Sequence, residues 1–211
     1  YYFKYLLFIY IYNIMYYDVC VIGSGPCGIY MCYELKKHNI NHICFEKGEI
    51  LDNLKKYPNI LWHSSINSLI LPSKQNSKIK DSKKKLYDND FIVKYYCNFV
   101  DEHKLDIKTH SKVYDISKND DKYTVNYINS NTKQSISCKY IIICTGIYEN
   151  NNKLKINTNY SFCHYNFKNF EIYNKKILIV GSGNSSIDYI TYLLPNNEII
   201  WVIRGKLYKN N

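Results

Sequence analysis

The sequence predicts an α/β fold in which one unit, made of a strand, a glycine turn, a helix and a second strand, occurs twice. The turns at 23–28 (GSGPCG) and 181–186 (GSGNSS) each follow an apolar run, and they begin 158 residues apart in a chain of 211. Between them, strand-like segments at 122–129 and 135–145 are separated by a polar break at 129–131. This pattern predicts a β-meander inserted after the first unit.

The first unit has all the elements of a βαβ pattern. An apolar run at 17–22 predicts the first strand, and apolar residues at helical spacing over 29–37 predict the helix that follows the turn. A second apolar run at 42–45 predicts the next strand, which ends directly before Glu46. We expect the two strands to be parallel.

A second helix is predicted over 88–104. Asp88 is a candidate N-cap, and the segment places Phe91, Tyr95 and Phe99 on one face of an amphipathic helix. Such a face predicts packing against the sheet of the first unit.

The segments after this helix predict further strands. A strand is expected over 105–117, and the last strand of the meander contains an apolar run at 140–144 that predicts full burial. That strand ends at Thr145 and Gly146, and an Asn-rich stretch at 149–159 follows. The composition therefore indicates a domain boundary near residue 148.

The second unit repeats the first. Apolar runs predict strands at 176–180 and 199–203, with a helix over 187–194 between them. The expected organisation is a first domain over 15–148 and a second over 149–211, which holds the N-terminal part of a truncated Rossmann-like fold.

The two ends of the chain carry separate expectations. Residues 1–14 form an aromatic and apolar stretch that is shorter than a spanning helix needs, so an extension or upstream read-through before Met15 is expected. The alternative is a segment that targets the protein to a membrane or an organelle. We further expect additional polypeptide to follow Asn211.

Composition excludes several classes of protein. The formal net charge is +10, but the lysines are spread along the chain and the dense run at 78–85 lies among polar residues, so nucleic-acid binding is not expected. The eight cysteines include Cys20, Cys44 and Cys144 in apolar runs, and no C-x-x-C pair occurs. These features predict free thiols in a reducing, cytoplasmic setting and no metal site.

The glycine turns predict dinucleotide binding. In such a turn the first glycine allows the tight bend, the second allows a pyrophosphate to approach the backbone, and the third lets the helix pack on the strand. Glu46 stands where an acid accepts hydrogen bonds from ribose hydroxyls. The second turn has Ser186 in the third position and no acid at its strand end, where Arg204, the only arginine of the chain, would face a 2′-phosphate. This residue favours NADPH over NADH.

These motifs resemble those of flavoproteins with two dinucleotide-binding domains, such as thioredoxin reductases and flavin-containing monooxygenases. The resemblance covers about residues 16–205. Additional motifs resemble the bacillithiol-disulfide-reductase-like branch, namely Phe45-Glu46-Lys47-Gly48, Tyr57-Pro58, Ser64-Ser65, Cys163-His164-Tyr165 and 201–205.

The resemblance implies two cofactors, FAD and NADPH. The residues it assigns to FAD are Gly23, Ser24, Gly25, Pro26, Cys27, Gly28, Glu46, Lys47, Ser64, Thr145 and Gly146. Those it assigns to NADPH are Gly181, Ser182, Gly183, Asn184, Ser185, Ser186 and Arg204. The Gly-Asp motif and final helix that close the FAD domain in the family are absent from this sequence, so the resemblance implies an incomplete FAD domain.

The cysteines depart from the patterns of related reductases. Without a C-x-x-C, a relay through such a pair is excluded, and Cys32 is interpreted as a packing residue of the helix. Cys27 stands at a helix N-terminus, where the dipole favours the thiolate, so it is a candidate redox residue with packing as the alternative.

Three functions are compatible with these motifs. The first is an NADPH-dependent FAD oxidoreductase acting on a low-molecular-weight disulfide. The second is a flavin-containing monooxygenase using oxygen, with which Asn184 and the missing C-x-x-C are compatible. The third is a truncated, non-catalytic nucleotide-binding remnant. For a longer protein the resemblance implies a homodimer and no membrane association.

Overall fold

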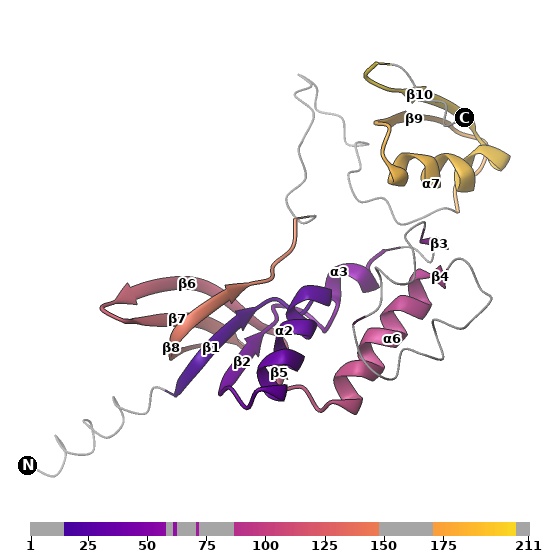
Figure 1. Ribbon diagram of the computed structural model, residues 1–211. Coiled ribbons are helices and arrows are strands. Elements are labelled where there is room, and N and C mark those ends of the chain that lie inside the picture. Colours follow the sequence, from indigo (N-terminus) through magenta and orange to yellow (C-terminus); the bar gives the residue numbers. More distant parts are fainter. Residues whose placement is uncertain (1–14, 58–60, 63–70, 72–86, 148–170, 206–211) are drawn as a thin grey trace, which may run out of the picture. The chain divides into compact units, whose positions relative to one another are not determined.

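The computed structural model describes residues 15–57, 61–62, 71, 87–147 and 171–205 (Figure 1). The chain forms two compact units, residues 1–152 and 153–211. No helix in the described ranges is both long and apolar enough to cross a membrane.

The first unit is built on a six-stranded sheet. Its strands are β1 (Tyr16–Ile22), β2 (His42–Phe45), β5 (Ile107–Lys108), β6 (Ser111–Asn119), β7 (Lys122–Asn129) and β8 (Thr132–Ile143). They lie in the order β5-β2-β1-β8-β7-β6. β1 pairs in parallel with β2 and β8, and β6, β7 and β8 form the predicted antiparallel meander. A short antiparallel pair, β3 (Leu61–Trp62) and β4 (Tyr87–Asp88), forms a separate sheet.

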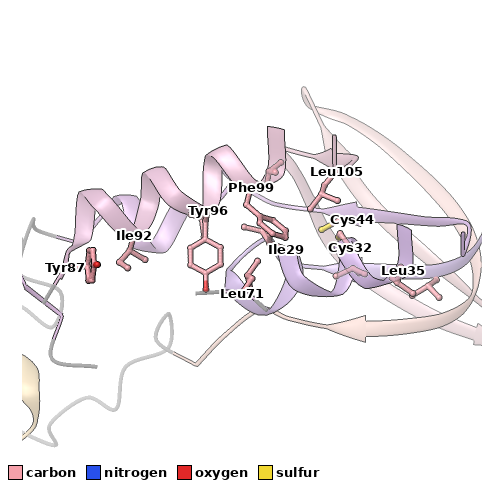
Figure 2. Close-up of a cluster of buried hydrophobic side chains, with 14 residues drawn as sticks. Ile29, Cys32, Leu35, Cys44, Leu71, Tyr87, Ile92, Tyr96, Phe99 and Leu105 are labelled. Atoms are coloured by element: carbon pink, nitrogen blue, oxygen red, sulfur yellow. The ribbon is translucent and has the colours of Figure 1, made fainter. Parts of the chain in front are cut away.

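Helices α2 (Pro26–Lys37) and α6 (Asn89–Glu102) bury their apolar sides in one core with alternate residues of β1 and β2 (Figure 2). The N-cap of α6 is Asp88, as predicted, and its side chain accepts a hydrogen bond from the backbone N–H of Phe91 at 2.8 Å. The short helix α3 (Asp52–Lys55) follows β2. The buried side chains of this core include Ile29, Cys32, Leu51, Ile92, Tyr96 and Phe99.

The remaining residues of β1 and β2 belong to a second core on the opposite face. Cys20, Ile43 and Phe45 pack there against residues of the meander. The rings of Phe45 and Tyr127 lie 4.3 Å apart between centroids. Successive strand residues alternate between the two cores, because side chains point to opposite faces of a strand. β1 and β2 are therefore buried on both sides, which explains their continuous apolar runs.

The second unit contains the start of another βαβ fold. β9 (Lys176–Val180) leads through the second turn into α7 (Asn184–Leu193), a short 3-10 helix η2 (Leu194–Asn196) follows, and β10 (Glu198–Val202) returns in parallel with β9. The predicted α/β fold class with two Rossmann-like units is thus confirmed.

Two predictions about the strands were wrong in detail, and one about α6 was correct. The segment 105–117, expected to form one strand, contains β5 and the start of β6. The break arises because β5 pairs with the end of β2 and the backbone then bends at His110, whose φ is +50°. The run at 140–144 is not fully buried, since Tyr140 and Ile143 are 56% and 68% exposed. On α6 the predicted apolar face is confirmed, because Phe99 is buried in the core and Phe91 and Tyr95 are partly buried against it. The Tyr95 hydroxyl also accepts a hydrogen bond from Leu71 N.

Candidate functional site

The first glycine turn is shaped by close backbone approaches. Gly23 has a φ of +100°, and a Cβ added to it would lie 2.5 Å from the carbonyl oxygen of Cys144. Its backbone N–H donates to the Phe45 carbonyl at the end of β2, at 2.8 Å. A Cβ on Gly28 would lie 1.9 Å from the Gly23 carbonyl oxygen. Both positions therefore require glycine.

The N-terminus of α2 is open above this turn. Gly25 is the N-cap residue, with no side-chain cap and with nothing within 4 Å of an added Cβ. Pro26 occupies the first turn of the helix, where its missing N–H costs nothing. Open backbone and an uncapped helix N-terminus fit a pyrophosphate, which such N–H groups and the helix dipole bind.

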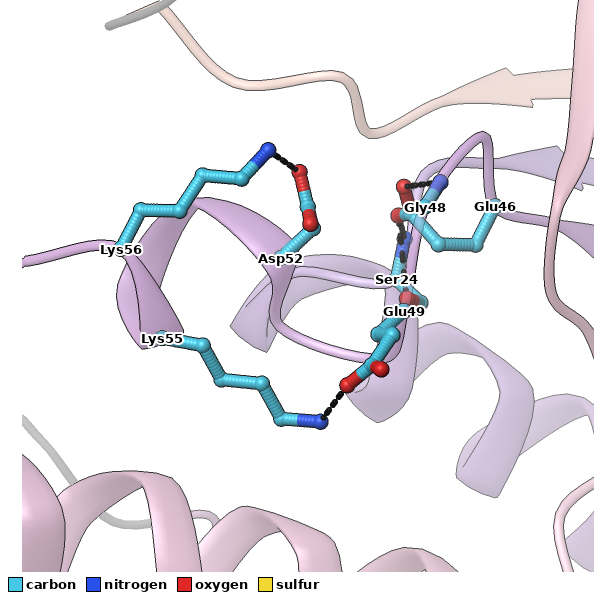
Figure 3. A network of polar contacts seen from close by, with 7 residues as sticks. All are labelled: Ser24, Glu46, Gly48, Glu49, Asp52, Lys55 and Lys56. Atoms are coloured by element: carbon cyan, nitrogen blue, oxygen red, sulfur yellow. Dashed lines mark hydrogen bonds and ion pairs between the residues drawn. The ribbon is translucent and has the colours of Figure 1, made fainter.

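Glu46 is fixed by three hydrogen bonds (Figure 3). Its Oε2 accepts from the backbone N–H of Ser24 at 2.8 Å and from the Ser24 hydroxyl at 3.0 Å, and its Oε1 accepts from Gly48 N at 3.0 Å. Glu46 is 8% exposed and Ser24 is fully buried. A carboxylate offers about four acceptor positions, so one remains on this side chain for a ribose hydroxyl. The residues present thus fit the pyrophosphate and one ribose of a dinucleotide.

The loop after β2 is tied together by ion pairs next to Glu46 (Figure 3). Lys55 pairs with Glu49 at 2.7 Å, and Lys56 pairs with Asp52. The Lys55 ammonium lowers the pKa of the Glu49 carboxyl. Both pairs include exposed side chains, so they contribute little to stability and mainly order the loop.

The structure brings most of the remaining residues assigned to FAD to this turn. The Cα of Thr145 lies 3.2 Å from the position of a Gly23 Cβ, and the neighbouring Gly146 has a φ of +73°. Lys47 is exposed directly after Glu46. Ser64 lies outside the described residues.

The cysteines differ sharply in exposure. Cys27 is exposed in the first turn of α2, whereas Cys32 is fully buried in the core, as predicted for a packing residue. A hydrogen bond from the neighbouring Cys44 thiol, with a further contribution from His42, lowers the pKa of Cys32 to about 6. Burial among apolar side chains makes Cys32 inaccessible to substrates. No group of three His, Cys, Asp or Glu side chains in the described part of the chain could hold a metal ion.

The second turn repeats the geometry of the first with different side chains. Gly181 has a φ of +125°, and its N–H donates to the Val202 carbonyl at the end of β10, at 2.9 Å. Gly183 is the N-cap of α7, with no side-chain cap and with open space at its Cβ position. Ser182, Asn184 and Ser185 are exposed, and Ser186 is buried.

The strand registers align the two units residue by residue. Ile22 pairs with Phe45 and Val180 pairs with Val202, so the position of Glu46 corresponds to Ile203 in the second unit. The next position, that of Lys47, corresponds to the exposed Arg204. The second unit therefore has no carboxylate at the ribose position and an arginine beside it.

Sequence reasoning missed one contact of the second turn, made by Trp201 of β10. The indole Nε1–H of Trp201 donates to the Gly181 carbonyl at 2.6 Å. The sequence did contain a signal for this contact. Trp201 lies in an apolar strand, and its indole N–H needs a hydrogen-bond acceptor when it is buried there.

Fold and site together define a protein with two dinucleotide-binding units. The chain belongs to the pyridine nucleotide-disulphide oxidoreductase family, whose model matches residues 20–211. The resemblance drawn from the two glycine turns is thereby confirmed.

Individual relatives agree with this assignment. The chain is 23% identical over 192 residues to bacilliredoxin reductase Bdr of Bacillus subtilis (strain 168), covering 89% of this chain and 57% of the relative. It is 26% identical over 206 residues to a ferredoxin–NADP reductase of Malacoplasma penetrans (strain HF-2), covering 92% and 59%. The solved structure of bacillithiol disulfide reductase Bdr (YpdA) from Staphylococcus aureus matches with a TM-score of 0.80 and 24% identity, covering 93% of this chain and 59% of that one. The chain thus spans less than two thirds of the length of these relatives.

Proposed function

We propose that the chain is the FAD-binding and NADPH-binding part of an NADPH-dependent flavin oxidoreductase. The observation that carries this proposal is a difference between the residues that follow β2 in the first unit and those that follow β10 in the second. The first unit has the buried Glu46 for a ribose, and the second has Ile203 with Arg204 beside it. A carboxylate is suited to a free ribose diol, whereas an arginine without a carboxylate is suited to a 2′-phosphate.

Each group of residues would have a distinct role. Gly25 and the N-terminus of α2 would hold the FAD pyrophosphate, and Glu46 its ribose. Gly183 and the N-terminus of α7 would hold the NADPH pyrophosphate. When bound, the flavin supplies the chemistry, since it accepts a hydride from NADPH and passes electrons to an acceptor.

The acceptor proposed is a low-molecular-weight disulfide. Its support is the name of the similar solved structure from Staphylococcus aureus, a bacillithiol disulfide reductase, together with the exposed Cys27 at the N-terminus of α2. Thiol–disulfide exchange requires a thiol that the disulfide can reach. Cys27 is therefore our candidate redox residue.

A second candidate is an oxygen-using enzyme of the flavin monooxygenase type. It is favoured by the absence of a C-x-x-C pair from the sequence and by the exposed Asn184 in the second turn. In that case Cys27 would have no part in the reaction.

The test is the absorbance spectrum of the full chain after incubation with FAD, recorded before and after anaerobic addition of NADPH. We expect retained flavin bands that bleach with NADPH and return on addition of a disulfide. Bleaching reversed by oxygen alone, with no effect of disulfides, would select the monooxygenase. A chain that retains no FAD would refute both and leave a nucleotide-binding remnant.

A further inference from the structure

The two glycine turns differ at the position of their third small residue. In the first turn a Cβ on Gly28 would lie 1.9 Å from the Gly23 carbonyl oxygen, so no side chain fits there. In the second turn Ser186 holds this position and its side chain is buried. The Gly181 carbonyl oxygen and Ser186 therefore cannot approach each other as closely as the Gly23 oxygen and Gly28 do in the first turn.

Trp201 bonds to the Gly181 carbonyl. Its indole N–H donates to the Gly181 oxygen at 2.6 Å, while the adjacent Val202 carbonyl accepts from Gly181 N at 2.9 Å. Both backbone polar groups of Gly181 are thus bonded to the end of β10. The matching residue in the first unit is Cys44, whose thiol lies 3.7 Å from the Gly23 oxygen. A thiol is a weak donor, so the first turn depends on its glycine instead.

We propose that Trp201 is a positioning residue for nucleotide binding at the second turn, an inference that rests on the proposed function. By holding the Gly181 carbonyl away from Ser186, it performs the task that the third glycine performs in the first turn. This contact keeps Gly183 and the N-terminus of α7 in the geometry that a pyrophosphate requires. Trp201 acts through the backbone and needs no contact with the nucleotide.

The test combines Trp201→Phe with Ser186→Gly in the full chain. W201F removes the indole donor, and we expect it to weaken NADPH binding by about threefold to tenfold, the range of one net hydrogen bond. S186G restores the space that the carbonyl needs, so the double variant should return to within about twofold of the wild-type affinity. W62F is the matched control, because the Trp62 indole also donates, to Asn89 Oδ1 at 3.3 Å, but belongs to the first unit. It should leave NADPH affinity unchanged.

The outcomes separate this inference from the proposed function. A wild-type chain that does not bind NADPH refutes the proposed function. A wild-type chain that binds NADPH, with a W201F variant of equal affinity, refutes the role of Trp201 alone. If W201F weakens NADPH binding and the added S186G does not restore the affinity, the role of Trp201 is also refuted. A merely structural loss would persist in the double variant.

A second measurement does not require W201F to fold. The sequence has two tryptophans, so the indole N–H region of a ¹⁵N spectrum has two signals, and W62F identifies the one from Trp201. NADPH should shift the Trp201 signal and leave that of Trp62 in place. A Trp201 signal that stays fixed at saturating NADPH overturns the inference.

Discussion

Removal of the Glu46 carboxylate tests whether the first turn is held by its polar network. Glu46→Ala deprives the Ser24 N–H and O–H groups of their acceptor, and Ser24 is fully buried. A buried donor left without a partner costs about 1–3 kcal/mol, so two of them should lower the free energy of unfolding by about 2–6 kcal/mol. Gly48 N also loses its acceptor, but Gly48 is only partly buried and adds less.

The assay is urea unfolding followed by the emission of Trp62, which packs against the core of the first unit. All the proteins compared carry W201F, so Trp62 is the one tryptophan left of the two in the sequence, and its emission reports on the first unit. Glu49→Ala is the matched control three residues further along, because its carboxylate is 60% exposed and pairs with Lys55 at the surface. We expect no resolvable change in the control. An E46A variant within about 0.5 kcal/mol of its background would refute the reasoning, since that is the range of ordinary surface substitutions.

Three further substitutions test other parts of the structure. Gly28→Ala should destabilise the first unit by about 2–3 kcal/mol in urea unfolding, through the 1.9 Å overlap with the Gly23 carbonyl, while Gly25→Ala, with open space at its Cβ, should cost well under that. Burial raises the pKa of Tyr96 from its ordinary value of 10.0. Above pH 10 this tyrosine therefore ionises in the unfolded chain but not in the folded one. The free energy of unfolding then falls as pH rises, by up to about 1.4 kcal/mol per pH unit. Y96F has no such proton and should show a shallower fall in unfolding free energy; an equal slope would contradict this. Arg204→Gln should weaken NADPH by about tenfold and leave NADH unchanged in paired titrations, and equal losses for both would remove Arg204 from the 2′-phosphate site.

Elements governed by local interactions were predictable from the sequence. The second strand begins and ends where the apolar run at 42–45 does, and Asp88 caps α6 through a bond three residues away. Gly23 and Gly181 were predictable because their positive φ angles disfavour other residues, and Gly28 because a side chain has no room there. The same reasoning indicated Glu46 as a site residue, since an acid directly after an apolar strand is conspicuous in the sequence.

Features that depend on distant partners were not predictable. The break between β5 and β6 is set by the backbone of the β2 loop, where Ser111 N bonds to Glu46 O and His110 N bonds to Gly48 O. Tyr140 lies in an apolar run, yet it is exposed, because β8 continues past Cys138, where its pairing with β7 ends, and is paired there with β1. The contact of Trp201 with Gly181 joins residues from two elements that only the parallel register brings together.

The two turns share a sequence pattern but differ in how they are held, and this difference bears on the proposed order of electron transfer. Ser24, the second residue of the first turn, is buried and bonded to a carboxylate, whereas Ser182 at the same place in the second turn is exposed. A turn fixed before the ligand arrives loses less conformational entropy on binding, which favours tight retention of a nucleotide. A turn with exposed polar residues favours exchange. The proposed enzyme would keep FAD and release NADP⁺ after each hydride transfer. The buried Ser24 in the unit that carries Glu46 and the exposed Ser182 in the unit that carries Arg204 would suit that difference.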